Sequence, residues 1–184
     1  MSSSGAEDAR DSGRRPPTAQ RSEMTGDGKL VIESARLDLV LDTREAVLAR
    51  IEALSPADRA EVSPEWVERM RQSTPSPWTH GMSLVERTSG AVVGSGGYKG
   101  PPDDDGAVEI AYGIGEEYRG RGYAKEGAAA LVEFALGAGA RLVYAHTRPE
   151  NSASARVLES CGFERVGEVV DPEDGLVWRW EHRE

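Results

Sequence analysis

Tyr118-Arg119-Gly120-Arg121-Gly122-Tyr123-Ala124-Lys125 is the most informative segment of the chain, and it lies between a strand-like run, 108–114, and a helix-like run, 123–136. Its two glycines remove side chains where a ligand must approach the backbone closely. The amides that follow are the unpaired donors of a helix N-terminus, where the helix dipole favours an anion. The segment therefore predicts a loop that binds a pyrophosphate group between a strand and a helix.

Two common phosphate-binding patterns do not match this loop. The dinucleotide pattern Gly-x-Gly-x-x-Gly needs a third glycine at the position of Lys125. The P-loop spacing is met by Gly122 and Gly127, but Ala128 and Ala129 replace the required lysine and hydroxyl residue. On the loop alone, an ordinary glycine-rich turn remains an alternative.

Two motifs in the right order resemble those of a known superfamily. Residues 119–124 fit the pattern Arg/Gln-x-x-Gly-x-Gly/Ala, which resembles the acyl-CoA loop of the GNAT N-acetyltransferases. Asn151 at a helix start, with Gly162-Phe163 after that helix, resembles the second signature of the same superfamily. The stretch 97–126 is most similar to the branch that includes the ribosomal-protein N-terminal acetyltransferases and many bacterial relatives.

The resemblance covers residues 30 to 184 and implies a fold. The fold class is α/β, with a central mixed, mostly antiparallel sheet that is splayed at its middle and flanked by about four helices. The splay is expected between the strand ending at Ile114 and the strand Leu142–Ala145. Residues 1–28 contain almost no large apolar side chains, so we expect a disordered tail there and one domain over 29–184.

The N-terminal part of this domain shows helix start signals. Thr43 is a predicted N-cap, and Ser63-Pro64 predicts the start of a second helix, because proline suits the first helical turn. In that second helix, Trp66, Val67 and Met70 are expected to face inward.

The resemblance also implies binding residues for acetyl-CoA, the expected co-substrate. The residues assigned to it are Ile114, Gly115 and Glu116 for the pantetheine arm, Arg119, Gly120, Arg121, Gly122, Tyr123 and Ala124 for the pyrophosphate, and Asn151 for the cofactor arm. The alternative role of Asn151 is a plain helix N-cap. No metal is expected, because the three histidines of the chain have no metal-ligand spacing.

Acetyl transfer to an amine requires a base, a donor for the oxyanion and, optionally, an acid for the leaving thiolate. Relatives place a carboxylate that acts through water at the position of Glu109, and the Ile114 amide is the expected oxyanion donor. An outward polar residue on an alternating strand explains Glu109 equally well. Tyr98 and Tyr112 are further candidates for the base, although packing explains both.

The position of the expected acid departs from the family pattern. Many relatives carry a tyrosine four places before the glycine of the closing Gly-Phe pair, and here that place is Leu158. Ser154 matches a position used in the ribosomal-protein branch and is expected to hydrogen-bond the sulfur; a solvated helix serine is the alternative. Cys161 is not expected to be a nucleophile, since no histidine lies near it in sequence to activate it.

The amino-acid composition limits the classes of binding partner. The net charge of −10 argues against nucleic acid or an anionic membrane surface as a partner. A single cysteine allows no internal disulfide, which favours the cytoplasm. The loop with Asp103, Asp104 and Asp105 suggests a cationic acceptor, although these acids equally serve solubility.

The sequence therefore predicts an N-acetyltransferase that moves an acetyl group from acetyl-CoA to a primary amine by direct attack in a ternary complex. The acceptor is a small-molecule amine or a protein N-terminus, and the protein is expected to be a monomer or a homodimer. The alternative function is a non-catalytic regulatory module that binds acyl-CoA.

Overall fold

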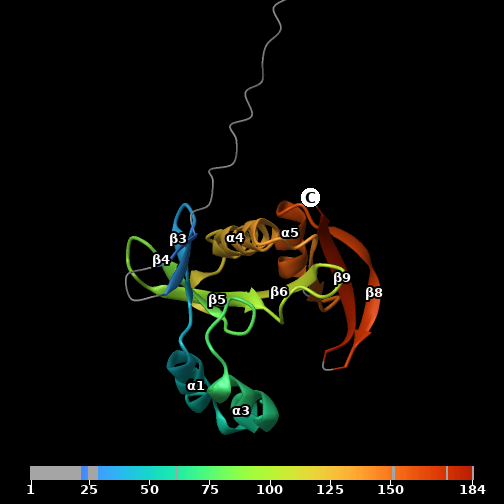
Figure 1. Cartoon of the computed structure of the whole chain (residues 1–184). Coiled ribbons are helices and arrows are strands. Elements are labelled where there is room, and N and C mark those ends of the chain that lie inside the picture. The colour runs from blue at the N-terminus through green and yellow to red at the C-terminus, as the bar shows by residue number, and fades with distance from the viewer. Residues whose placement is uncertain (1–21, 25–28, 61, 151, 173, 184) are drawn as a thin grey trace, which may run out of the picture.

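One mixed sheet organises the chain, as Figure 1 shows. The computed structural model describes residues 22–24, 29–60, 62–150, 152–172 and 174–183. These residues form a nine-stranded sheet in the order β1-β2-β3-β4-β5-β6-β7-β9-β8. The strands are β1 (Ser22–Met24), β2 (Leu30–Glu33), β3 (Leu37–Leu41), β4 (Met82–Glu86), β5 (Val92–Tyr98), β6 (Ala107–Ile114), β7 (Leu142–Thr147), β8 (Glu164–Asp171) and β9 (Gly175–Arg183).

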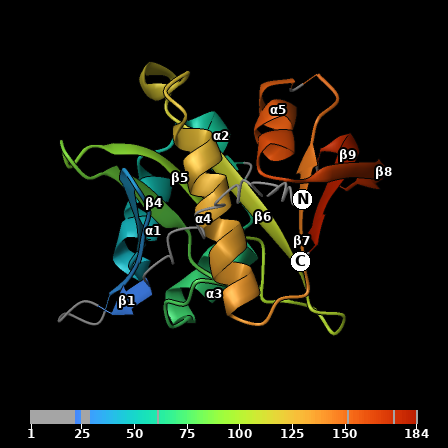
Figure 2. The same cartoon turned by 90° about the horizontal axis from the view of Figure 1, so that it is seen from above.

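The sheet is splayed at its middle, as predicted. All neighbouring strands are antiparallel except β6 and β7, which run parallel. This parallel pair joins only Ala107–Glu109 to Leu142–Tyr144. Beyond these residues, β6 continues to Ile114 and β7 to Thr147 without pairing to each other, so the two strands diverge (Figure 2).

The helices cover both faces of the sheet. In Figure 1, α4 and α5 lie on one face, and α1 and α3 lie on the other. Figure 2 shows that α4 crosses the sheet and begins at the end where β6 and β7 are apart. The described helices are α1 (Arg44–Glu52), α2 (Pro56–Ala60), α3 (Pro64–Gln72), α4 (Tyr123–Gly137), α5 (Ser152–Ser160) and the short 3-10 helix η1 (Glu116–Tyr118).

Close packing fixes the position of α4 against the sheet. Leu131 and Ala135 of α4 are fully buried in the core. Gly127 lies so near the sheet that a Cβ there would come within 2.6 Å of Leu84 Cδ2. A side chain at Gly127 would force the buried Leu84 to shift, so this glycine allows α4 to pack closely on the strand beneath it.

The predicted helix starts are confirmed in the N-terminal part. The side chain of Thr43 accepts a hydrogen bond from the Ala46 amide, and Ser63 accepts one from the Trp66 amide. Met70 is buried as expected, but the prediction that Trp66 faces inward is wrong, since 36% of it is exposed. The nine-residue helix α3 has few neighbours to cover that indole, and the short helix α2 was not predicted.

The N-terminal segment differs from expectation at three residues. Ser22–Met24 form β1, which pairs with β2 through Ser22 and Ile32 and through Met24 and Leu30. The other residues of the expected tail lie outside the described residues. No helix in the described part of the chain is both long and apolar enough to cross a membrane.

Candidate active site

A cleft lies where β6 and β7 diverge, and we call it the α4–α5 cleft. Its volume is about 560 Å³. It is lined by the end of β6, by the connection into α4 and by one side of α5. The lining residues are Tyr112, Gly113, Ile114, Tyr118, Arg119, Gly120, Gly122, Tyr123, Ala124, Lys125, Ala153, Ser154 and Val157.

The glycine loop has the geometry that the sequence predicts. Gly120 and Gly122 both have positive φ angles, +75° and +82°, which side chains other than glycine rarely adopt. A Cβ at Gly120 would meet nothing within 4 Å, so the backbone there is open to the cleft. The loop therefore offers bare backbone to a ligand.

The first turn of α4 supplies unpaired donors at this loop. The first hydrogen bond of the helix runs from the Glu126 amide to the Gly122 carbonyl, at 3.2 Å. The preceding amides, those of Tyr123, Ala124 and Lys125, donate to no protein acceptor among the described residues. Such a turn, lined by glycines and backed by a 15-residue helix, fits a phosphate group.

The basic side chains of the loop brace it. Arg119 Nε donates to the Ile114 carbonyl at 3.4 Å, and Arg121 Nη2 donates to the Glu117 carbonyl at 3.0 Å. Arg121 also lies over the Tyr118 ring, 5.6 Å from its centroid. Both guanidinium groups thus hold the connection between β6 and α4 in shape while keeping positive charge near the cleft.

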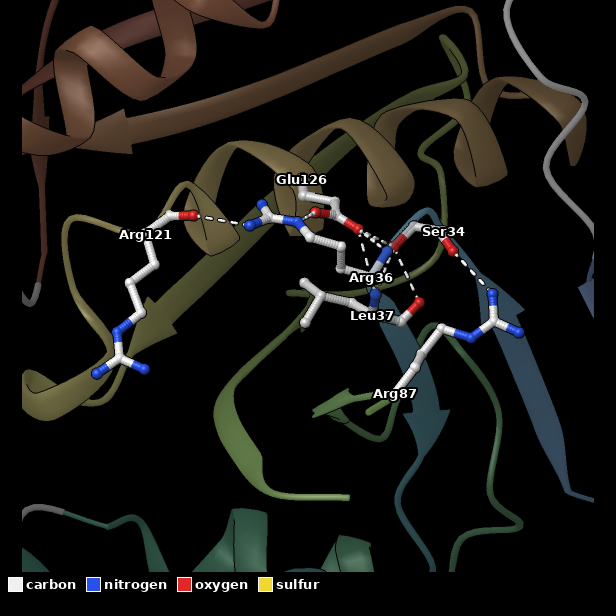
Figure 3. Close-up of polar contacts among 6 residues, drawn as sticks. All are labelled: Ser34, Arg36, Leu37, Arg87, Arg121 and Glu126. Carbon is white, nitrogen blue, oxygen red and sulfur yellow. Dashed lines mark hydrogen bonds and ion pairs between the residues drawn. The ribbon is translucent and has the colours of Figure 1, made fainter. Parts of the chain in front are cut away.

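A carboxylate in the first turn of α4 ties the loop to the turn between β2 and β3 (Figure 3). Glu126 accepts hydrogen bonds from Ser34 Oγ at 2.7 Å and from the Leu37 amide at 3.2 Å. It also accepts from the Arg36 amide and forms an ion pair with Arg36 Nε at 2.9 Å. One partly buried carboxylate therefore satisfies four donors of a turn that is about 90 residues away in sequence.

Arg36 extends this contact to the glycine loop itself. Its Nη1 donates to the Arg121 carbonyl at 3.0 Å, as drawn in Figure 3. Its guanidinium also lies over the Tyr123 ring, 4.9 Å from the centroid. Arg36 and Glu126 therefore position the peptide that enters α4.

The pKa of Glu126 reflects these contacts. Burial alone would raise it, but the hydrogen bonds from Ser34 and Arg36 and the charge of Arg36 outweigh burial and hold it below the ordinary value. A group whose pKa is lowered by folding stabilises the fold above its unfolded pKa, about 4.3 for glutamate, and loses that contribution as the pH falls through the folded value.

We expect Glu126→Gln to lower the free energy of unfolding by about 1–2 kcal/mol at pH 7, because a charged acceptor is lost from several hydrogen bonds. The difference from the wild type should shrink as the pH falls below about 4.3. Chemical denaturation at several pH values measures it. Glu133→Gln on the same helix is the control: burial raises the pKa of Glu133, so its replacement should show no such loss. A difference that does not change with pH would contradict the ionic role.

Two hydroxyl groups meet inside the α4–α5 cleft. The Tyr112 hydroxyl, from β6, lies 3.2 Å from Ser154 Oγ, from α5. Burial raises the pKa of Tyr112 to about 12, although the Ser154 hydrogen bond lowers it, so the phenol keeps its proton at neutral pH. From the sequence, packing was the favoured role for Tyr112. The alternation of β6, which turns every second side chain toward α5, was the signal that could have placed its hydroxyl in the site.

The other residues expected to bind the cofactor differ in whether their backbone amides are available. The Gly115 amide donates to the Val93 carbonyl at 2.9 Å, so it is already used in pairing with β5. Because alternate residues of a strand direct their polar groups to opposite sides, the Ile114 amide points away from β5, toward the splay. Asn151 lies outside the described residues.

Glu109 lies on the sheet face opposite Tyr112, because the two are three residues apart on one strand. Only 11% of its side chain is exposed. Its Oε1 accepts from Lys99 Nζ at 3.0 Å and is 3.1 Å from His146 Nδ1. Glu109 is therefore a largely buried, ion-paired group rather than an outward polar one. Sequence reasoning did not identify Lys99 or His146 as its partners.

The remaining candidates are structural. The Tyr98 hydroxyl donates to the Leu131 carbonyl at 2.6 Å, and Leu158 is fully buried in the core. Burial raises the pKa of the Cys161 thiol, which disfavours the reactive thiolate. Among the described residues, no group of three or more His, Cys, Asp or Glu side chains is placed to hold a metal ion.

Comparison with known protein families gives a match to this site. Residues 35–164, which include the glycine loop and the cleft, match the family described as acetyltransferase (GNAT) domain. The chain belongs to the GNAT acetyltransferase family. Two curated relatives are similar to part of this chain: the uncharacterized N-acetyltransferase p20 of Bacillus licheniformis, 27% identical over 92 residues, and the uncharacterized N-acetyltransferase YjdG of Bacillus subtilis (strain 168), 31% identical over 81 residues.

These matches are partial in length. They cover 50% and 44% of this chain and 52% and 48% of the two relatives, so the chain spans about half the length of the curated relatives that it matches.

Solved structures confirm the GNAT fold. RimL, a ribosomal L7/L12 alpha-N-protein acetyltransferase in complex with coenzyme A, has a TM-score of 0.63 at 17% identity over 83% of this chain and 97% of that one. The spermidine/spermine N-acetyltransferase SpeG from Vibrio cholerae has a TM-score of 0.64 at 16% identity over 81% of this chain and 93% of that one. At these identities the likeness concerns the fold alone.

Proposed function

We propose that this GNAT protein is an N-acetyltransferase that moves an acetyl group from acetyl-CoA to a primary amine by direct attack in a ternary complex. The observation that carries the proposal is the first turn of α4, where the unpaired amides of Tyr123, Ala124 and Lys125 line the α4–α5 cleft beside two glycines. The solved RimL complex supports it, because that protein of the same fold binds coenzyme A.

Each part of the cleft has a proposed task. The loop from Arg119 to Ala124 and the first turn of α4 bind the pyrophosphate group, and Arg36 and Glu126 keep this loop in place. Backbone groups near Ile114, at the splay, bind the pantetheine arm. Acetyl-CoA supplies the acetyl group as a thioester, which an amine can attack. We also propose that Asn151, which precedes Ser152 in the sequence, bonds the cofactor arm.

The proton-handling groups lie on both faces of β6. Glu109 acts as the base that removes the amine proton, through water, and Lys99 and His146 hold its carboxylate in one orientation. Ser154 hydrogen-bonds the sulfur, and the neighbouring Tyr112 hydroxyl supplies a second donor. A donor pair of this kind compensates for Leu158, which stands where many relatives carry a tyrosine.

The acceptor class that we propose is based on the structurally similar proteins. RimL is described as acting on a protein N-terminus, and SpeG on spermidine and spermine. We therefore propose a protein N-terminus or a small amine as acceptor and a monomer or homodimer as the working form. We propose the cytoplasm as the compartment, because the single cysteine allows no internal disulfide.

The test is to measure the release of free CoA from acetyl-CoA with a panel of amines, and to identify acetylated products by mass spectrometry. Turnover with at least one amine is the expected result. Tight binding of acetyl-CoA without turnover of any amine would favour a regulatory module instead. Competition with ATP and NAD is the binding control, and both should fail to displace acetyl-CoA.

A further inference from the structure

A second cleft lies on the face of the sheet that α1 covers, and we call it the α1 cleft. Its volume is about 310 Å³. It shares Tyr112 and Gly113 with the α4–α5 cleft. The two clefts therefore meet across β6, one on the side of the glycine loop and the other on the side of Glu109. The α1 cleft therefore offers a route by which an acceptor can approach a thioester in the splay from the α1 face.

Two charged side chains line the α1 cleft, and both are cationic: Arg50 of α1 and Lys99, just after β5. Each is paired with a carboxylate, Arg50 with Asp42 at 2.8 Å and Lys99 with Glu109 at 3.0 Å. The members of each pair differ sharply in exposure. Arg50 and Lys99 are 49% and 48% exposed, whereas only 5% of Asp42 and 11% of Glu109 are exposed.

This arrangement gives the cleft a positive lining in a protein of net charge −10. Each ion pair is neutral as a whole, but the cation is the half that a ligand meets. The exposed cations lie nearer to a ligand in the cleft than the buried carboxylates do. Because the Coulomb energy falls with distance, the attraction of the cations exceeds the repulsion of the carboxylates. A ligand in this cleft therefore meets two cationic groups first.

Both cations have spare hydrogen-bond donors. Arg50 uses only Nη2, which donates to Asp42 and, at 3.3 Å, to Ser83 Oγ. Within the described part of the chain, its Nε and Nη1 have no acceptor. The Lys99 ammonium has three donors and gives one of them to Glu109. Asp42 is fixed in turn by Ser83, so the Arg50 guanidinium is held in place while its Nε and Nη1 donors stay available.

We propose that the amine acceptor carries an anionic group, a carboxylate or a phosphate, which binds in the α1 cleft to Arg50 and Lys99. The free Nε and Nη1 donors of Arg50 and the Lys99 ammonium can each give a charged hydrogen bond to an oxygen of either group. The inference rests on the proposed acetyl transfer and names the acceptor class for it. The acceptor amine then lies near β6, within reach of the face that carries Glu109.

An anionic acceptor differs from the cationic acceptor that the sequence suggests. That suggestion rested on Asp103, Asp104 and Asp105, none of which lines either cleft. Asp103 instead serves its own loop, since its Oδ1 accepts from the amides of Asp105 and Ala107. An acidic group does lie nearby, since Glu117 lines the neighbouring cleft that Arg50 also borders.

The test uses matched acceptor pairs that differ only in the anionic group: β-alanine with β-alaninamide, and phosphoethanolamine with ethanolamine. Wild-type protein should show a larger kcat/KM for the anionic member of at least one pair. Arg50→Gln should reduce the ratio of kcat/KM within that pair by about 10-fold or more, since charged hydrogen bonds are lost. Using the ratio cancels any general loss of folded or active protein.

A matched control and a readout without turnover complete the test. Arg87→Gln removes an arginine that is also ion-paired and partly exposed but lines neither cleft, and it should leave the ratio unchanged. In thermal-shift measurements with CoA present, the anionic members should raise the Tm of the wild type but not of Arg50→Gln.

The outcomes separate the two proposals. If amines are acetylated but the member without the anionic group is preferred in both pairs, the anionic acceptor is wrong and acetyl transfer stands. If no amine is acetylated, acetyl transfer is in question, and the thermal shifts alone decide whether Arg50 forms an anion site. Equal shifts with acids and amides would then overturn it.

Discussion

Gly122→Val is expected to weaken acetyl-CoA binding by more than ~10-fold, equivalent to about 1.4 kcal/mol. Gly122 caps α4 with a φ angle of +82°, a conformation that a β-branched residue avoids. A Cβ there would also lie 3.3 Å from Arg36 Nη2, so the side chain would crowd the arginine that positions the loop. Calorimetric titration with acetyl-CoA measures the change.

A second glycine separates lost binding from backbone strain. Gly90, in the turn between β4 and β5, has a φ angle of +71°, and a Cβ there would meet nothing within 4 Å. Gly90→Val should therefore cost stability through similar strain while leaving acetyl-CoA affinity unchanged. If folded Gly122→Val bound acetyl-CoA as tightly as the wild type, the glycine loop would not be the pyrophosphate site.

Glu109→Gln is expected to lower kcat by about 100-fold or more, with a smaller effect on acetyl-CoA binding. The amide has nearly the shape of the carboxylate but cannot accept a proton from the amine. Glu109 has a position suited to this task, because Lys99 and His146 hold it on the face of β6 that borders the α1 cleft. Steady-state kinetics with the best amine from the screen measures the effect.

Glu181 offers a matched control. It is 13% exposed and is paired with two cations, Arg179 and Arg183, so its burial and pairing resemble those of Glu109. Glu181→Gln should leave kcat within a few-fold of the wild-type value. A similar small effect for Glu109→Gln would show that Glu109 only stabilises the fold through its ion pairs.

Local patterns explain how much of the fold was predictable. Period-two alternation and turn signals identified the strands of the central hairpin, and cap residues such as Thr43 and Ser63 marked helix starts, since these features depend on neighbours in sequence. The splay between β6 and β7 was predicted through the family resemblance. The inward face of α3 was partly wrong, because only the tertiary neighbours decide how much of Trp66 is covered.

The parts of the site whose residues are contiguous in the sequence were predictable. The glycine loop is such a case. The contacts of Glu126 with Ser34 and Arg36 join segments that are about 90 residues apart, and a distance of that kind leaves no periodic signal in the sequence. The same applies to the Glu109 and His146 pair and to the Arg50 side chain, which comes to β6 from a helix earlier in the chain.

The narrow join between β6 and β7 has a consequence for local unfolding. Among the described residues, strand pairing between β1–β6 and the block formed by β7, α5, β8 and β9 is confined to three residue pairs, and α4 packs against both parts. The C-terminal block is therefore placed to open on its own at a free energy below that of global unfolding. A ligand held between α4 and α5 would oppose that opening by mass action. Backbone amides of β9, which does not line the α4–α5 cleft, should then exchange hydrogen for deuterium more slowly once acetyl-CoA is bound.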